Sequence, residues 1–320
     1  MKAMETLERE SQRRAREAAK KYKLQQKQQE IANAAIAVKN YENYLQVLQS
    51  VHKEAAETVH WEKMVQESAP VEPALSAKNE EIALHKLKHY KPSFFDKLFK
   101  SQPKKIANLE KNVGYAKGKD QQLFEQQQKK HREDLANWQQ SQELAKAIVS
   151  HDPARYAQVI EQLKPFSDIK ELGTQVILAF TPHYITADLH VNSDDVIPQE
   201  IPSQTATGKL SKKKMPVFKA NELYQDFVCS CVLRIARELL AIIPVETVVV
   251  NAVSEKINTS IGKADYPAIL SVVFTRAALH KLNFAAIDPS DSMSNFAHHM
   301  KFSKSAGFSP VERINPASLP

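Results

Sequence analysis

The stretch from residue 221 to residue 274 constrains the fold most, because it reads as a buried helix that leads into a buried sheet. Apolar residues recur at near four-residue spacing over 221–240, which is the period of an amphipathic helix. Pro244 interrupts the pattern, and the valine-rich run 245–253 is typical of a strand buried on both faces. A second apolar run covers 269–274. The two runs predict an antiparallel hairpin with a long loop.

The first 150 residues have a different character, that of long polar helices. Residues 3–67 contain neither Pro nor Gly and are rich in good helix formers. From Ile31 to Val59 apolar residues recur at alternating three- and four-residue spacing, which predicts a coiled-coil seam. We expect a second long helix over 104–149, folded back on 31–67 as an antiparallel pair. A homodimeric coiled coil through residues 1–67 is the competing arrangement.

The segment 91–100 is expected at the far end of this pair, and Ser93 is a suitable N-cap for a short amphipathic turn. One interpretation is a hydrophobic plug at the tip of a helical hairpin. The alternative is an exposed patch that docks on a membrane surface or a partner, beside Lys97 and Lys100. The apolar residues concerned are Phe94, Phe95, Leu98 and Phe99.

The second half of the chain predicts a small globular domain. Asp152 and Pro153 are the preferred cap and first residue of a helix over 154–163. Two strands are expected at 175–180 and 184–191. The stretch 194–215 reads as a long irregular loop. Further helices are expected at 276–282 and from 288 to about 300, followed by a coil-like tail over 301–320. The predicted fold class is therefore α+β, with long helices in residues 1–150 and an α+β domain with antiparallel strands in residues 151–320.

Charge is distributed unevenly along the chain. The net charge is +7. Residues 1–150 contain 27 Lys and Arg against 20 Asp and Glu, whereas residues 151–320 contain 17 of each. This excess permits nucleic acid as a partner without requiring it. The basic run around Arg13 to Lys23 is either a solvated helix face or an arm that touches phosphate or acidic lipid.

The cysteine count and the absence of targeting segments indicate a cytoplasmic protein. Cys229 and Cys231 lie two residues apart on the predicted helix and point to different faces, so we expect two small buried residues. No apolar run is long enough for a transmembrane helix, and residues 1–27 lack the apolar core of a signal peptide.

No recognised catalytic motif is present, and no cofactor or metal is predicted. The Gly208-Lys209 pair lacks the first glycine of a phosphate loop, no Cys and His cluster has zinc spacing, and no Gly-x-Ser-x-Gly sequence occurs. Arg234 and Glu238 lie one helical turn apart and predict a structural ion pair. The alternative is an anion site formed by Arg234 and Arg237.

Two polar sets in the second half suggest contact with nucleic acid. A lysine-rich run in the 194–215 loop would contact phosphate; it consists of Lys209, Lys212, Lys213 and Lys214. An acidic set would hold a divalent metal against phosphate, as in nucleases, or form an ordinary polar surface. This set consists of Asp188, His190, Asp194, Asp195 and Glu200.

Five segments resemble a family of uncharacterised bacterial proteins that have a coiled-coil front half. They are KPSFFDKLF (91–99), GKLSKKKMP (208–216), NELYQDFVCSCVLRIARELLAIIPVE (221–246), LNFAAIDPSDSMSNFAHHMKF (282–302) and GFSPVERI (307–314). The resemblance covers most of the chain from about residue 85. It implies a bacterial origin and the two-part layout, and it implies no catalytic activity.

These observations lead to three hypotheses. The first is a non-catalytic interaction protein that assembles with itself or with a protein partner through its helices. The second is a nucleic-acid-binding or metal-dependent nuclease-like protein, with a role in phage defence. The third is a peripheral membrane protein that docks through the phenylalanine-rich segment.

Overall fold

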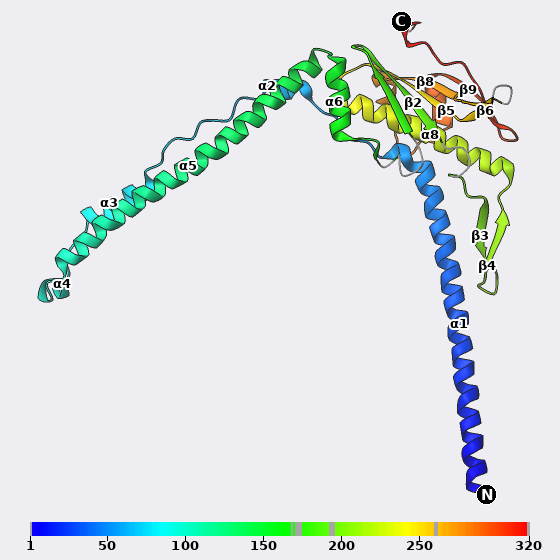
Figure 1. The fold of residues 1–320 in the computed structure, drawn as a ribbon, viewed down its shortest axis with the longest axis horizontal. Coiled ribbons are helices and arrows are strands. Elements are labelled where there is room, and N and C mark those ends of the chain that lie inside the picture. Colours follow the sequence, from blue (N-terminus) through cyan, green and yellow to red (C-terminus); the bar gives the residue numbers. More distant parts are fainter. Residues whose placement is uncertain (1, 168, 170–174, 192–195, 259–261, 319–320) are drawn as a thin grey trace. The chain divides into compact units, whose positions relative to one another are not determined.

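The chain forms two compact units (Figure 1). The computed structural model describes residues 2–167, 169, 175–191, 196–258 and 262–318, with side chains from residue 18 onward except at 95 and 97. One unit, which we call the body, contains residues 1–59 and 151–320; the other, which we call the hairpin, contains residues 60–150. Residues 1–59 therefore group with the C-terminal half, whereas the sequence suggested one domain for residues 1–150.

A six-stranded sheet forms the centre of the body, and it confirms the α+β fold class. Its strand order is β1-β2-β5-β8-β9-β10, in which β2 and β5 are parallel and the other neighbours are antiparallel. The predicted central hairpin is confirmed, since β5 pairs with β8 along its length. The strands are β1 (Gln175–Phe180), β2 (Tyr184–Val191), β5 (Thr247–Ser254), β8 (Ala268–Thr275), β9 (Ala297–Ser303) and β10 (Gly307–Ser309).

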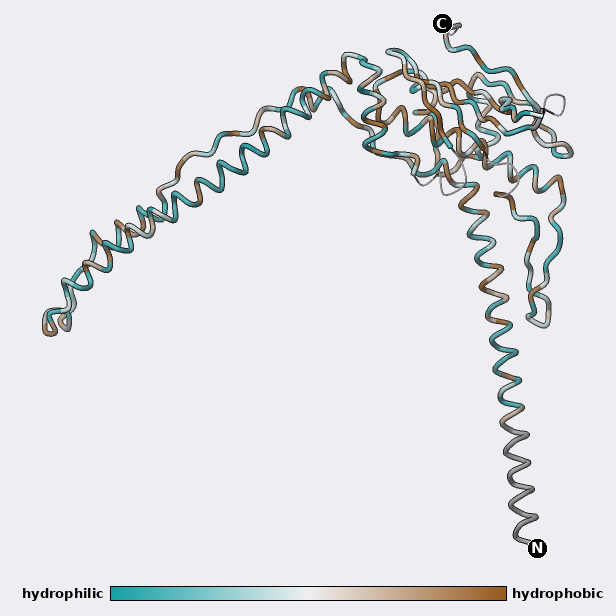
Figure 2. Tube along the Cα trace, viewed as in Figure 1, coloured by the Kyte–Doolittle hydropathy of each residue, from teal (hydrophilic) through white to brown (hydrophobic). Residues whose placement is uncertain are grey.

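The long helix α8 (Val217–Ile242) packs on this sheet and confirms the predicted buried helix. Its apolar residues Phe227, Ile235 and Leu239 are fully buried. Cys229 and Cys231 are both buried and both free, as expected of small core residues. Figure 2 shows the most hydrophobic parts of the chain gathered on α8 and the central strands. Burial of this apolar surface is the main source of the body's stability.

The C-terminal part of the first helix, α1 (Lys2–Ser50), packs against the rest of the body, so the predicted antiparallel pairing of 31–67 with the second long helix is wrong. Its apolar stripe faces α8 and a two-stranded ribbon made of β3 (Glu200–Gln204) and β4 (Leu210–Lys214). Side-chain hydrogen bonds reinforce the contact: the Tyr44 hydroxyl donates to the Val196 carbonyl at 2.8 Å, and the Gln204 amide donates to the Ile31 carbonyl at 3.2 Å. The stripe was predicted correctly from Ile31 to Leu48, but the helix ends at Ser50 rather than continuing toward residue 67. Periodicity also does not say which apolar surface will cover a stripe.

The hairpin consists of helices that run out and back. Its helices are α2 (Trp61–Gln66), α3 (Lys78–Lys88), α4 (Phe94–Leu98) and α5 (Gln102–Val149). Helix α5 packs against α2 and α3, so the segment that packs along α5 is 61–88 rather than the predicted 31–67. The Trp138 indole donates to the Glu67 carbonyl at 3.2 Å, and the buried Asp120 carboxylate accepts the Glu80 amide at 2.9 Å at the start of α3. These bonds fix the register of α5 against the segment 61–88.

The remaining elements include three corrections to the sequence predictions. The expected loop over 194–215 contains the β3–β4 ribbon, the expected helix from 288 contains η2 and strand β9, and the expected coil tail contains β10. Strand β9 pairs with the earlier strand β8, whereas β3 with β4 and β9 with β10 form local hairpins. In all three cases strand pairing overrides weak local preferences. The predicted cap of α6 is confirmed, because Asp152 accepts the Ala154 amide. The other elements are η1 (Val51–Lys53), α6 (Pro153–Leu163), β6 (Lys256–Asn258), β7 (Lys263–Asp265), α9 (Arg276–Leu279), η2 (Asp291–Asn295) and η3 (Pro316–Ser318).

Among the described residues, no helix combines the length and the apolar character that a bilayer crossing requires.

Candidate functional site

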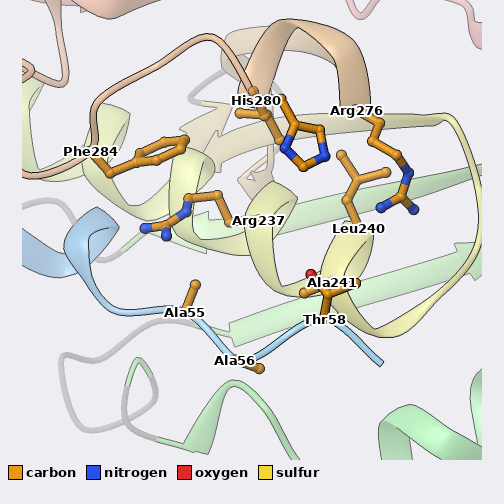
Figure 3. A pocket seen from close by; sticks show the side chains of 10 residues that line it. Ala55, Ala56, Thr58, Arg237, Leu240, Ala241, Arg276, His280 and Phe284 are labelled. Atoms are coloured by element: carbon orange, nitrogen blue, oxygen red, sulfur yellow. The ribbon is translucent and has the colours of Figure 1, made fainter. Parts of the chain in front are cut away.

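A pocket of about 170 Å³ lies in the body between the segment that follows α1, the C-terminal part of α8, and α9 with the loop after it. Small apolar side chains such as Ala55 and Ala241 line one side. Three cationic or titratable side chains, Arg237, Arg276 and His280, line the other. Figure 3 shows that the two arginine side chains point to opposite sides, with His280 between them. The volume is below the usual 300–1,000 Å³ of small-molecule sites, so the pocket suits only a small ligand.

The polar side chains of α8 beside this pocket hold the backbone that follows α1. Ser230 accepts the His52 amide at 2.9 Å, and both Glu238 carboxylate oxygens lie 3.1 Å from the Ala56 amide nitrogen. Arg234 pairs with Glu238 at 2.8 Å, and the two residues are 7% and 1% exposed. Buried charges need partners of this kind. The segment after α1 is therefore fixed to α8 by a buried polar cluster.

The two arginines predicted as an anion site have separate structural contacts. Arg234 forms the ion pair with Glu238 that the one-turn spacing predicted, and it also lies 3.6 Å from Glu54. Arg237 donates to the His52 carbonyl, and its guanidinium lies 3.8 Å from the centre of the Phe284 ring. Burial lowers the pKa of Arg237, and the charge of Arg234 lowers it further.

Arg276, the other cation of the pocket, is also committed to the backbone. Its guanidinium donates to the Ile243 and Val245 carbonyls at 3.1 and 3.0 Å, and it lies 3.6 Å from the exposed Glu246 carboxylate. These contacts hold the turn between α8 and β5. The arginine donors around the pocket thus serve the fold, and we assign the pocket no ligand.

The three described members of the predicted acidic set, Asp188, His190 and Glu200, have separate contacts. Asp188 accepts the Asn251 amide at 2.9 Å and pairs with Arg313 at 2.8 Å, while the His190 ring packs 5.1 Å from Tyr266. Glu200 lies on the ribbon and pairs with Lys212 at 3.1 Å. Asp194 and Asp195 lie outside the described residues. Within the described part of the chain, no group of three or more His, Cys, Asp or Glu residues could hold a metal ion.

A different acidic pocket, of about 640 Å³, lies in the body, and sequence reasoning missed it. Asp226 from α8 faces Asp288 there. Burial is the main cause that raises the pKa of Asp226, and the Gln49 amide donates to its carboxylate at 2.9 Å. Asp288 accepts the Ser290 and Asp291 amides at 2.9 and 3.0 Å. Those bonds make Asp288 a capping residue of its loop, as the sequence Asp-Pro-Ser predicts.

The predicted lysine run lies on the β3–β4 ribbon, and all four side chains are exposed. Lys209 follows Gly208 in the ribbon turn, and Lys212, Lys213 and Lys214 lie on β4. Side chains alternate along a strand, so Lys212 and Lys214 share one face and Lys213 lies on the other. Because the ribbon packs against α1, its lysines lie in the same unit as the basic part of that helix.

The turn of the hairpin exposes apolar side chains, as the second interpretation of 91–100 predicted. Phe94, Leu98 and Phe99 are 76%, 62% and 72% exposed, so the plug interpretation is wrong for these three residues. The side chain of Phe95, the fourth predicted member, lies outside the described ones. Among the other exposed hydrophobic residues of the hairpin is Tyr115 on α5.

A buried carboxylate holds this turn in place. Asp96 accepts the Ser93 amide and the Tyr90 hydroxyl, both at 3.0 Å, and pairs with Lys105 at 2.5 Å. In return, the Ser93 hydroxyl accepts the Asp96 amide, which completes a reciprocal cap. The predicted N-cap role of Ser93 is confirmed. The spacing Ser-x-x-Asp could also have predicted that Asp96 completes this cap.

Comparison with protein-family models, with curated proteins and with solved structures finds no match to this chain. The resemblance to a bacterial family thus rests only on the five segments quoted above.

Proposed function

We propose that this protein is a non-catalytic interaction protein whose hairpin docks on an anionic membrane surface through its turn. The observation that carries the proposal is the exposure of Phe94, Leu98 and Phe99 on a turn that a buried polar network holds in place. We call these three residues the tip.

Polar contacts order the backbone of the tip. An apolar turn without such support would collapse onto the neighbouring helices to bury its side chains. Asp96 supplies the support by bonding the backbone before α4 and the side chain of Lys105 after it. The exposed apolar side chains of the tip can therefore enter another apolar medium.

The charge around the tip favours an anionic lipid surface over a neutral one. Residues 91–105 contain five lysines and one aspartate, a net charge of +4. One of the five, Lys105, is paired with Asp96. Each lysine near an anionic bilayer contributes about 1 kcal/mol, and burial of one phenylalanine contributes roughly 1.5–3 kcal/mol. Apolar and basic contributions together are what reversible membrane anchoring requires.

Vesicle co-sedimentation tests this proposal. We expect the full-length protein to bind vesicles that contain phosphatidylglycerol and to bind pure phosphatidylcholine much more weakly. The double substitution Phe94→Asp and Phe99→Asp should lower the affinity for anionic vesicles by a factor of about 100 or more, since it removes roughly 3–6 kcal/mol of apolar burial. The matched control is Tyr115→Asp, because Tyr115 is as exposed as Phe94 but lies on α5.

Two results would contradict membrane docking. One is equal vesicle binding by the double variant and the Tyr115→Asp control. The other is no vesicle binding by the wild type together with a tip-dependent change in its mass in solution, measured by light scattering. That second result would assign the tip to a contact between copies of this chain.

A further inference from the structure

The geometry points to a second surface on the body, formed by α1 and the β3–β4 ribbon, that binds the phosphate backbone of duplex nucleic acid. Two lysine clusters that lie almost 200 residues apart in the sequence meet where the ribbon turn rests on α1. This inference does not depend on the membrane proposal, because it concerns different residues in the other unit.

The contact between Ile31 and Gly208 places the two clusters side by side. A Cβ atom on Gly208 would lie 2.7 Å from Ile31 Cγ1, so the ribbon turn sits directly against α1. Lys209 is the next residue of the turn, and Lys27 lies one helical turn before Ile31. Figure 1 shows the ribbon lying alongside the middle of α1.

The face of α1 that packs on the ribbon changes from apolar to basic where the ribbon ends. Its buried or half-buried members include Ile31, Ala34 and Val38. The same three- and four-residue spacing continues toward the N-terminus with Lys27 and Lys23, and then with Lys20, all exposed. Residues at this spacing lie on one side of a helix. The stripe therefore extends the line of the ribbon lysines along α1.

The charge of this surface exceeds that of the whole protein. Residues 18–40 contain five lysines and one glutamate, and residues 200–219 contain another five lysines and one glutamate. The sum is ten minus two, or +8, whereas the full chain carries +7. Within the surface, Lys212 pairs with Glu200, and both side chains are 55% exposed. Such a pair is weak and exchanges easily for phosphate.

Lysine on a straight helix suits a duplex. Lysine acts on phosphate as a point charge, and such contacts carry no sequence information. The lysine stripe from Lys20 to Lys27 extends about 10 Å at about 1.5 Å per residue, which matches roughly three base pairs. The phosphates of a duplex keep a regular spacing over that length. We therefore expect sequence-independent binding, tighter to a duplex than to a single strand.

A salt-series titration with labelled duplex and single-stranded DNA and duplex RNA tests the inference on the full-length protein. Duplex affinity should fall steeply with salt. One triple variant replaces Lys20, Lys23 and Lys27 with Gln. A second triple variant replaces Lys209, Lys212 and Lys214 with Gln, since Lys212 and Lys214 share one face of the ribbon. Each should flatten the slope of log K against log salt by about 2–3, since each phosphate contact contributes about 0.9.

The matched control replaces three exposed hairpin lysines, Lys117, Lys129 and Lys130, with Gln and removes the same charge. This control should keep the wild-type slope, as should the Phe94→Asp and Phe99→Asp protein. Circular dichroism establishes that each variant is folded. The inference is overturned if the control flattens the slope as much as the two triple variants do. It is equally overturned if the wild type binds no duplex at low salt or prefers a single strand.

Discussion

Replacement of Glu238 with Gln should unfold the body at a much lower urea concentration. The Glu238 carboxylate is 1% exposed, binds Arg234 at 2.8 Å and accepts the Ala56 amide. Glutamine keeps the shape and one acceptor but removes the charge. Arg234 then keeps its buried positive charge beside a neutral amide, and Glu54, at 3.6 Å and largely exposed, is a weaker carboxylate contact. Removal of one partner of a buried ion pair costs roughly 3–5 kcal/mol.

Glu246→Gln is the control for this experiment. Glu246 also faces an arginine, but its side chain is 80% exposed, so its loss should cost at most about 1 kcal/mol. Urea unfolding followed by far-ultraviolet circular dichroism measures both variants. Trp61 and Trp138, the two tryptophans, lie in the hairpin, so tryptophan fluorescence reports that unit separately and should keep its wild-type midpoint. A Glu238→Gln cost within about 1 kcal/mol of the Glu246→Gln cost would refute the reasoning.

Three further outcomes are expected. Gly208→Ala should destabilise the body by roughly 1 kcal/mol or more, because φ of Gly208 is +84° and the new methyl group would meet Ile31. Gly262 also has a positive φ but lacks such a contact, so Gly262→Ala should cost less in the same urea experiment. The pair with Lys105 is the main cause that lowers the pKa of Asp96, so the order of the turn should be lost as pH falls below 3.8. Hydrogen exchange of peptides over 90–101 should show this loss in the wild type. In the Asp96→Asn variant the same peptides should exchange rapidly even at neutral pH. Burial raises the pKa of Asp226, so the folded state binds more protons than the unfolded state above pH 3.8, and stability falls as pH rises through this window. The Asp226→Asn variant should lack that fall and be more stable than the wild type at pH 7. A wild-type protein that gains stability through Asp226 as pH rises would contradict the raised pKa.

Elements with a strong local signal were predictable from the sequence. Helix α8 and strands β5 and β8 follow from apolar periodicity and valine content, and α6 follows from the Asp152 cap with Pro153. Strand β9 was mistaken for a helix because a seven-residue strand with two adjacent histidines has little propensity of its own. It forms because its backbone pairs with β8.

The candidate sites also divide into those that the local sequence predicts and those that contacts between distant residues decide. The tip was predictable, since the phenylalanines of a short segment stay together whatever the fold. The sequence could not decide whether Arg234 and Arg237 form an anion site or make structural contacts, because Arg237 contacts His52 and Phe284, both far away in the chain. The basic surface of α1 and the ribbon was present only as two separate lysine runs.

The sequence alone therefore determined the strongly periodic elements such as α8, the apolar face of α1, and where positive charge accumulates, since these properties depend on neighbours within a few residues. Only the tertiary structure decided what covers each face. Nothing between residues 3 and 67 breaks a helix locally, yet α1 ends at Ser50. It ends there because Ser230 and Glu238 of α8 bind the backbone amides of the next segment. Backbone groups that find buried partners elsewhere no longer need the helix, and the sequence of the segment itself does not record those partners.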